Sequence, residues 1–142
     1  MSLHEIIYVS LASQEMSEAE LAHLLEDSRI RNLAQGISGM MIYHRREFMQ
    51  LLEGEQSTIF AVYDRIVRDP RHQQIYKLWD GPIAQRNFEH WEMAYVSPDG
   101  LDLAQHEGYR PFFDKGLVAS TEDSTGKKIL LNMRDDLLQL KC

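Results

Sequence analysis

Two apolar runs separated by only two residues constrain the fold of this 142-residue chain more than any other feature. The runs ISGMMIYH (residues 37–44) and EFMQLLEG (residues 47–54) flank Arg45 and Arg46. Strand patterns this close in sequence are typical of a β-hairpin. The two runs are therefore predicted to be neighbouring antiparallel strands, and the other elements must be arranged around them.

A helix is predicted on each side of this hairpin. Ser17 and Glu20 form a capping-box pattern that opens the first helix, which runs to about residue 33 and is ended by Gly36. The second helix begins near Ser57 and is stopped by Pro70. Further strands are predicted at residues 4–9, 74–79 and 91–96 because these runs are short and apolar.

The resulting order, β-α-β-β-α-β with an extra strand, predicts an α+β, ferredoxin-like fold with two helices on one face of the sheet. In this topology the first and third strands are neighbours in the middle of the sheet. Residues 1–97 are predicted to form this domain, and residues 98–142 a C-terminal helical extension for signal output or sheet capping.

The extension contains one or two short helices between residues 101 and 118 and a last amphipathic helix. The apolar stripe of that last helix consists of Leu130, Met133, Leu137 and Leu140. This stripe packs either on the open face of the same sheet or on another chain, and self-association is predicted from it.

Composition excludes several classes of function. There are 22 acidic and 15 basic residues, and a net charge of -7 repels nucleic acids and anionic membranes. Cys142 is the single cysteine, so a disulfide within the chain and a cysteine-based metal site are excluded; no metal site is predicted. The first residues lack the pattern of a signal peptide, and no apolar run approaches the ~20 residues that span a bilayer. We therefore expect a cytoplasmic protein.

Polar residues occur on the predicted buried stripe of the first helix. Leu21, Leu24 and Leu25 define that stripe, and helical periodicity places Ser28 and Asn32 on it as well. A buried amide without partners costs about 1–3 kcal/mol. Asn32 must therefore bond either to nearby backbone or to a polar ligand.

The two central strands also carry polar residues on the helix-covered face. Strand alternation places Gln50 between Phe48 and Leu52, and Tyr8 on the face of Ile6. If the two strands are adjacent, the Tyr8 hydroxyl can donate to the Gln50 amide oxygen. The pair is either purely structural or part of a binding site.

A charged cluster, RDPRH (residues 68–72), ends the second helix. It is either a solvated helix end or a place where Arg71 and His72 hydrogen-bond the polar edge of a ligand. Together these polar sites suit a flat ligand that is apolar at one end and carries carbonyl and ring-nitrogen acceptors at the other. A flavin ring has this character, as do other heterocycles.

In combination these residues resemble the BLUF domains, which are blue-light sensors that use FAD. The resemblance rests on Tyr8, on Arg31 and Asn32 in IRNLAQGISG, on Gln50 in FMQLLEG, on RDPRH, and on Phe88, Trp91 and Met93 in an F-x-x-W-x-M pattern. It covers roughly residues 4–97. With no attached effector domain, the chain resembles the short stand-alone members.

The resemblance implies a photoreceptor rather than an enzyme. It implies an FAD site between the two helices formed by Tyr8, Ser28, Arg31, Asn32, Phe48, Gln50, Leu52, Arg65, Ile66, Asp69, Arg71 and His72. Tyr8 would give an electron and a proton to the light-excited flavin, and Gln50 would rotate or tautomerise. The changed hydrogen-bond network would shift the absorption slightly to the red.

Signalling is expected to pass through the strand at residues 91–96 to a downstream effector protein. Either Trp91 or Met93 would lie next to Gln50, although Trp91 as plain core packing is an alternative. Two other functions stay open: a hydrolase of the acylphosphatase kind or a flavin oxidoreductase, and a light-independent binding module. The loop SLASQEMS disfavours the acylphosphatase because it offers neither Arg nor Gly to a phosphate.

Overall fold

The computed structural model describes residues 2–14, 16–44, 46–70, 72–87, 94–96 and 124–141. Its elements are β1 (Leu3–Ala12), α1 (Glu18–Gln35), β2 (Ser38–His44), β3 (Glu47–Glu55), α2 (Gln56–Val67), β4 (His72–Pro82), β5 (Ala94–Val96) and α3 (Thr125–Lys141). The strand order is β4-β1-β3-β2-β5. Only β2 and β5 pair in parallel among these strands. The ferredoxin-like α+β prediction, with one extra strand, is confirmed.

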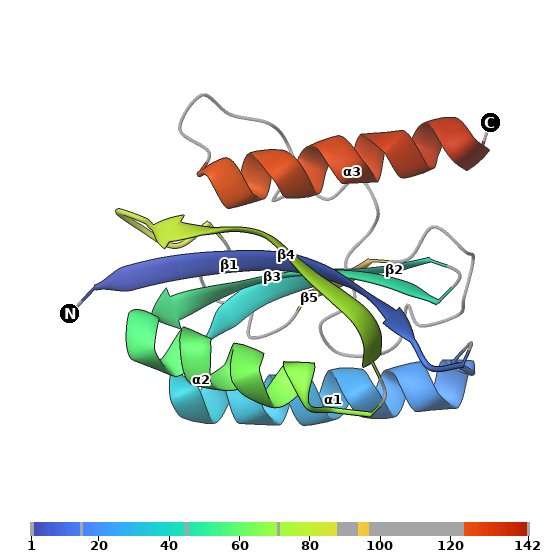
Figure 1. Cartoon of the computed structure of the whole chain (residues 1–142), viewed down its shortest axis with the longest axis horizontal. Helices are drawn as coiled ribbons and strands as arrows, with labels where there is room; N and C mark the ends of the chain where they lie inside the picture. Colours follow the sequence, from blue (N-terminus) through green and yellow to red (C-terminus); the bar gives the residue numbers. More distant parts are fainter. Residues whose placement is uncertain are drawn as a thin grey trace.

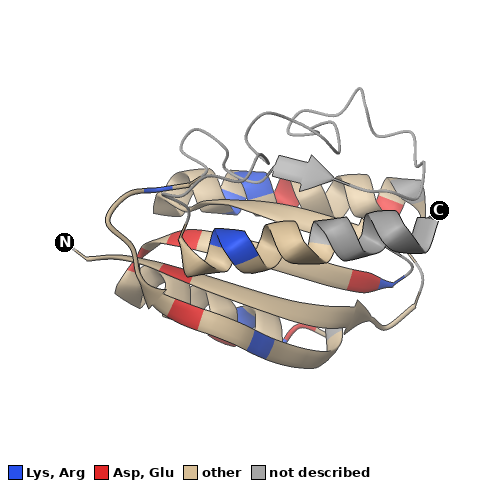
Figure 2. Ribbon diagram, turned by 90° about the horizontal axis from the view of Figure 1, so that it is seen from above, with Lys and Arg blue, Asp and Glu red and all other residues tan. Residues whose placement is uncertain are grey.

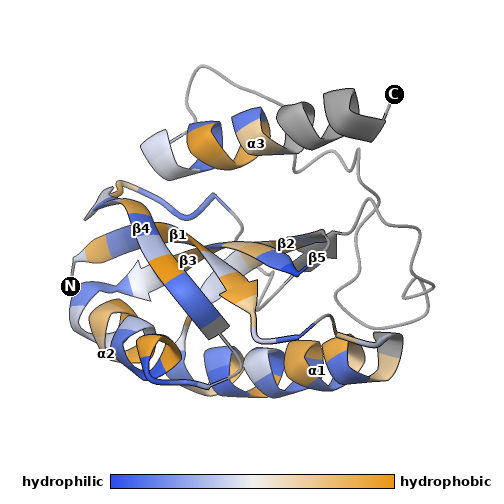
Figure 3. Cartoon of the chain, turned by 45° about the vertical axis from the view of Figure 1, so that its right-hand side comes forward, coloured by the Kyte–Doolittle hydropathy of each residue, from blue (hydrophilic) through white to orange (hydrophobic). Residues whose placement is uncertain are grey.

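The molecule has three layers, with α1 and α2 on one face of the sheet and α3 on the other (Figure 1). Because the sheet is covered on both faces, each face has its own apolar core, and Figure 3 shows hydrophobic segments in all three layers. Ile6, Tyr8, Phe48 and Leu52 lie in the core under α1 and α2. The prediction that both helices share one face is confirmed.

Helix α1 begins and ends as its sequence predicts. The Ser17 hydroxyl accepts from the Glu20 N–H at 3.1 Å, and the Glu20 carboxylate accepts from the Ser17 N–H at 3.1 Å. Gly36 has a φ of 69°, and its N–H bonds to the carbonyls of Asn32 and Leu33. A left-handed residue at this place is the usual end of a helix, and glycine adopts it without strain.

The hairpin between β2 and β3 is confirmed, and its turn is tied to the end of β1. Arg46 has a φ of 73°, in the left-handed region that residues other than Gly and Asn rarely adopt. Its guanidinium donates to the Ala12 carbonyl from Nε at 3.1 Å and Nη2 at 2.9 Å. The Ala12 N–H donates in turn to the Arg46 carbonyl at 2.7 Å. These bonds hold a backbone conformation that the local sequence does not favour.

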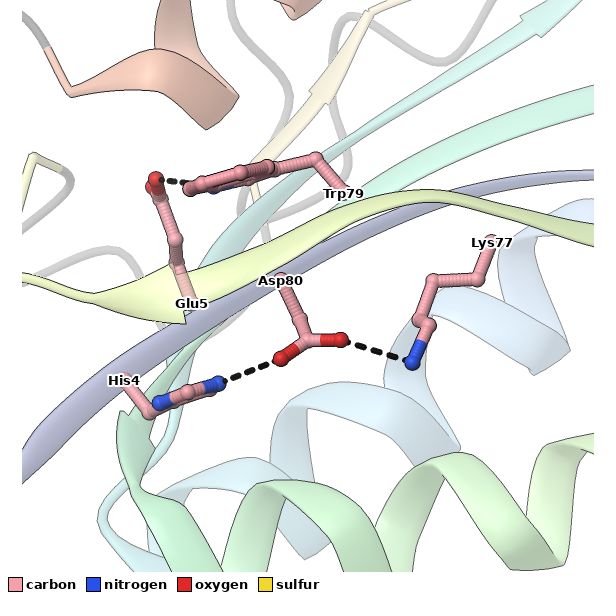
Figure 4. Close-up of polar contacts among 5 residues, drawn as sticks. All are labelled: His4, Glu5, Lys77, Trp79 and Asp80. Carbon is pink, nitrogen blue, oxygen red and sulfur yellow. Dashed lines mark hydrogen bonds and ion pairs between the residues drawn. The ribbon is translucent and has the colours of Figure 1, made fainter.

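Strand β4 is longer than the predicted 74–79 segment, because pairing with β1 extends from Ala12↔His72 to His4↔Pro82. The preceding helix ends at Val67, three residues before the proline that was predicted to stop it. Asp80 on β4 accepts from His4 at 2.9 Å and pairs with Lys77 at 2.6 Å (Figure 4). The Lys77 ammonium, and after it His4, hold the pKa of the Asp80 carboxyl below its usual range.

The described part of the apolar stripe of α3 packs on the chain's own sheet, which is the first of the two predicted alternatives. Leu130 is fully buried and Leu131 is 4% exposed. They pack with Ile7, Met40, Ile42, Met49 and Leu51, and Met133 lies against the same cluster. The side chains of Leu137 and Leu140, and residues 101–118, lie outside the described part of the chain. Among the described residues, no helix is both long and apolar enough to cross a membrane.

Candidate functional site

A cavity of about 130 Å³ that is open to solvent lies between the sheet and the helices α1 and α2. Its wall consists of Leu24, Ser28, Arg31 and Asn32 from α1, Met41, Gln50 and Leu52 from the sheet, and Val62, Arg65, Ile66 and Asp69 from α2 and the turn after it. A wall of apolar residues with a few polar groups is typical of small-molecule sites.

Tyr8 and Gln50 form a hydrogen bond under this wall. The register pairs them directly across β1 and β3, and the Tyr8 hydroxyl donates to Gln50 Oε1. Tyr8 is fully buried and Gln50 is 7% exposed. Because Oε1 accepts from the phenol, the amide NH₂ is the part of Gln50 that can donate to other groups. The predicted contact between strands one and three is confirmed.

The surroundings of Tyr8 keep its phenol protonated. Burial raises the pKa of Tyr8 far above its usual range, with Tyr63 adding to the rise and Arg31 opposing it. The Tyr63 ring meets the Tyr8 ring edge to face, with centroids 5.4 Å apart and planes at 67°. Such a contact fixes ring orientation and contributes about 0.5–1.5 kcal/mol beyond burial. Tyr8 is therefore a neutral hydrogen-bond donor with a defined orientation.

The polar residues of α1 line the cavity as the helical periodicity predicts. Ser28 is 5% exposed and Asn32 is 2% exposed. The Asn32 carbonyl accepts from the Ile37 N–H at 2.8 Å at the helix end, while its side chain lies in the wall. Arg31 Nε is buried and has no hydrogen-bond partner among the described residues. A buried donor of this kind needs an acceptor, and a ligand in the cavity can supply one.

The structure brings together eight of the twelve residues predicted to bind a cofactor, since Ser28, Arg31, Asn32, Gln50, Leu52, Arg65, Ile66 and Asp69 all line the cavity. Tyr8 reaches the wall through Gln50. Phe48 is not in the wall; its ring packs against Tyr43 with centroids 4.8 Å apart. Arg71, the side chain of His72, Trp91 and Met93 lie outside the described part, although the backbone of His72 begins β4.

Three wall residues, Leu24, Met41 and Val62, were not predicted as site residues. Leu24 was predicted to be buried, but an apolar residue at core spacing gives no sequence signal that separates a cavity wall from a packed core. Arg65 extends the site toward solvent, and its guanidinium donates to Gln35 at 3.2 Å across the two helices.

A ferredoxin-like sheet, with a cavity between its two helices and a phenol–amide pair under the wall, defines the class of this protein as a small ligand-binding domain. A family model described as "BLUF: Sensors of blue-light using FAD" matches residues 3–94. The chain belongs to the BLUF family of flavin-binding blue-light sensors. The prediction that this part of the chain is a blue-light sensor domain is therefore confirmed by the family.

Relatives and solved structures agree with this family. The chain is 31% identical over 101 residues to photoactivated adenylate cyclase subunit alpha of Euglena gracilis, covering 70% of this chain and 10% of that protein. The chain thus spans about a tenth of the length of the cyclase subunits it matches. The dark-state structure of the BLUF protein BlrB has a TM-score of 0.65 and 34% identity, covering 68% of this chain and 73% of that one. BlrP1 of Klebsiella pneumoniae with FMN and cyclic diGMP has a TM-score of 0.63 and 27% identity, covering 67% of this chain and 26% of that one.

Proposed function

We propose that this chain is a blue-light photoreceptor that binds FAD in the cavity between α1 and α2 and passes its light-induced change to a partner protein. The observation that carries the proposal is the hydrogen bond from Tyr8 to Gln50, since it joins a redox-active phenol to a cavity wall. Family membership supports a flavin as the ligand, and the family's description supports FAD.

The wall suits the flavin ring system. Leu24, Met41, Val62 and Ile66 offer apolar surface to the ring's hydrocarbon end. Asn32 and Gln50 carry amides that can donate to carbonyl oxygens and accept from a ring N–H. Arg31 adds a buried N–H donor that needs an acceptor.

Tyr8 and Gln50 would perform the light-driven step. A bound flavin supplies blue-light absorption and, once excited, oxidising power. Tyr8 gives up an electron and the proton on Oη, and Gln50 relays that proton and then rotates or tautomerises. Return of the electron and proton restores the phenol, while the Gln50 amide presents a changed set of donors and acceptors to the cavity. In a buried site such a rearrangement has large energetic consequences.

An absorption spectrum recorded before and after blue light tests this proposal. The purified protein should be yellow, its spectrum should shift to the red under light, and the shift should recover in darkness. Tyr8→Phe and Gln50→Leu should each keep the flavin colour and lose the shift. Tyr43→Phe is the matched control, because Tyr43 is buried in the same core but its hydroxyl accepts from the Met16 N–H at 3.1 Å.

Two results would contradict the proposal. A normal photocycle in Tyr8→Phe or Gln50→Leu removes the assigned roles of these residues. A colourless protein that ignores light favours the light-independent binding module. Chromatography of the released cofactor separates FAD from the FMN that is present in the BlrP1 structure.

For the output, we propose that residues 1–97 form the flavin-binding domain and residues 98–142 the output or capping segment. Either Trp91 or Met93, just before β5, would lie next to Gln50. Support comes from β5 itself, which pairs with β2 at Met41↔Tyr95, while Met41 pairs with Gln50 on β3. A cytoplasmic location, a downstream effector protein and self-association belong to the same proposal, and mass in solution, dark and lit, tests the last.

A further inference from the structure

Two buried carboxylates lie opposite each other on the face of the sheet that α3 covers. Glu5 on β1 is 1% exposed, Glu53 on β3 is fully buried, and the register pairs them directly. A carboxylate is expensive to bury unless hydrogen-bond donors surround it. Hydrogen-bond donors must therefore lie next to both side chains, and the fold is destabilised if these donors move away.

Two of the donors to Glu5 lie at the N-terminus of α3. Ser124 Oγ donates to Glu5 Oε1 at 2.6 Å, and the Gly126 N–H donates to Glu5 Oε2 at 2.9 Å. Trp79 Nε1 donates to the same carboxylate at 3.1 Å from β4 (Figure 4). The free N–H groups of a helix start favour a carboxylate, so Glu5 both accepts from α3 and complements its dipole.

Asn87 connects Glu53 to Ser124, the residue before α3. The backbone N–H and side-chain Nδ2 of Asn87 donate to Glu53 Oε2 at 2.8 and 3.2 Å. Asn87 Nδ2 also donates to Ser124 Oγ at 2.9 Å. Ser124 in turn caps the N-terminus of α3, because its Oγ accepts from the Lys127 N–H at 3.2 Å. Both carboxylates are thus connected to the residue that caps α3.

Gly126 shows how closely the helix start fits against Glu5. A Cβ atom at this position would lie 2.6 Å from Glu5 Oε1 and 2.8 Å from its carboxyl carbon. That distance is shorter than van der Waals contact, so any larger residue moves either the carboxylate or the first turn of α3. Figure 2, viewed from the α3 side, shows the helix lying over the sheet.

We propose that Glu5 and Glu53 form a latch that fixes the N-terminus of α3 to the sheet and makes the position of α3 depend on the alignment of β1 and β3. The same two strands carry Tyr8↔Gln50 three residue pairs away, which is roughly 10 Å along the strands. A change in the Tyr8–Gln50 bond on one face therefore reaches α3 on the other. This second step rests on the proposed photoreceptor function; the latch itself does not.

Hydrogen–deuterium exchange in the dark tests the latch. Glu5→Gln keeps the shape of the side chain but removes its charge and one acceptor, so exchange in residues 125–133 should become roughly tenfold to hundredfold faster, as expected for a lost charged hydrogen bond. Exchange in α1 and α2 should stay unchanged. Glu47→Gln is the matched control, because Glu47 is an exposed glutamate on β3.

Gly126→Ala is a second probe that leaves both carboxylates in place. Alanine favours a helix more than glycine does, so the substitution should raise exchange in α3 only by displacing the first turn from Glu5. Fast exchange in both variants supports the latch. Exchange of α3 at the wild-type rate in both variants overturns it, whatever the flavin content of the protein.

Illumination tests the connection to the cavity. Blue light should raise exchange in residues 125–133 of the wild-type chain, and Tyr8→Phe should abolish that rise. A normal spectral shift with no change in α3 exchange overturns the connection while the proposed photoreceptor function stands. Loss of the spectral shift in wild type contradicts the photoreceptor function, while the dark result still decides the latch.

Discussion

At the scale of single residues, Tyr8 is an acid whose ionised form the fold does not accommodate. It is fully buried, its hydroxyl donates to Gln50, and burial raises its pKa far above the usual value near 10. A phenol that stays protonated can both donate the hydrogen bond and give up its proton together with an electron. The same burial that would suit Tyr8 to its proposed role makes the free energy of unfolding depend on pH in the alkaline range.

Because the folded-state pKa of Tyr8 lies above the unfolded-state value, its contribution to stability is complete below about pH 10 and is lost as the pH rises further. The free energy of unfolding should fall with pH more steeply in wild type than in Tyr8→Phe, by about 1.4 kcal/mol per pH unit above pH 10. Urea unfolding at several alkaline pH values measures the difference. Parallel pH profiles for the two proteins would show that Tyr8 ionises in the folded state.

The sequence predicts site residues well wherever their position follows from periodicity. Ser28 and Asn32 lie on the stripe of Leu21, and Tyr8 meets Gln50, because helix and strand periods are fixed by backbone geometry. Glu5 and Glu53 were not predicted as a pair, since donors to them come from residues 79, 87, 124 and 126, far along the chain. Local patterns carry no information on such distant donors.

At the scale of elements, helix α1 depends on its capping box. The reciprocal bonds between Ser17 and Glu20 satisfy two N–H groups at the helix start. Bonding to Ser17 also holds the pKa of the Glu20 carboxyl below its usual range, so this contribution is present at neutral pH and is lost as the pH falls through that lowered value.

Ser17→Ala should lower the free energy of unfolding by about 1 kcal/mol, because the Glu20 N–H loses its acceptor. Urea denaturation followed by circular dichroism measures this loss. Gln14→Ala provides the control, since Gln14 is an exposed polar residue in the same connection between β1 and α1 and should change stability by less than about 0.5 kcal/mol. Equal free energies of unfolding for the two variants would show that the capping box does not stabilise α1.

The order and type of the elements followed from the sequence, whereas some of their bounds did not. The hairpin was predictable because its two strands are separated by two residues, although its Arg46 turn lacks the usual glycine or asparagine. Strand β4 was predicted too short because only residues 74–79 form an apolar run, and the Gly81–Pro82 pair beyond it is not typical of a strand. The structure continues pairing through both, since the Pro82 end lies at a sheet edge.

At the scale of the whole molecule, the two faces of one sheet carry different features. Its α1–α2 face holds the cavity, and its other face holds α3 through an apolar cluster and the carboxylate latch. The central strands β1 and β3 contribute to both faces because their side chains alternate. A two-layer ferredoxin-like sheet would leave one apolar face open to solvent, and α3 is the part of the described chain that covers it.

This arrangement predicts the result of shortening the chain to end at residue 123. Loss of α3 would expose the apolar residues Ile7, Met40, Ile42, Met49 and Leu51 on one face. A contiguous apolar surface of this kind promotes association. Light scattering coupled to size exclusion should therefore give a larger mass for the shortened chain than for the full chain at equal concentration. The flavin absorbance per chain should be retained, because the cavity lies on the opposite face. A smaller assembly for the shortened chain would instead mean that α3 joins protomers, contrary to its packing on its own sheet.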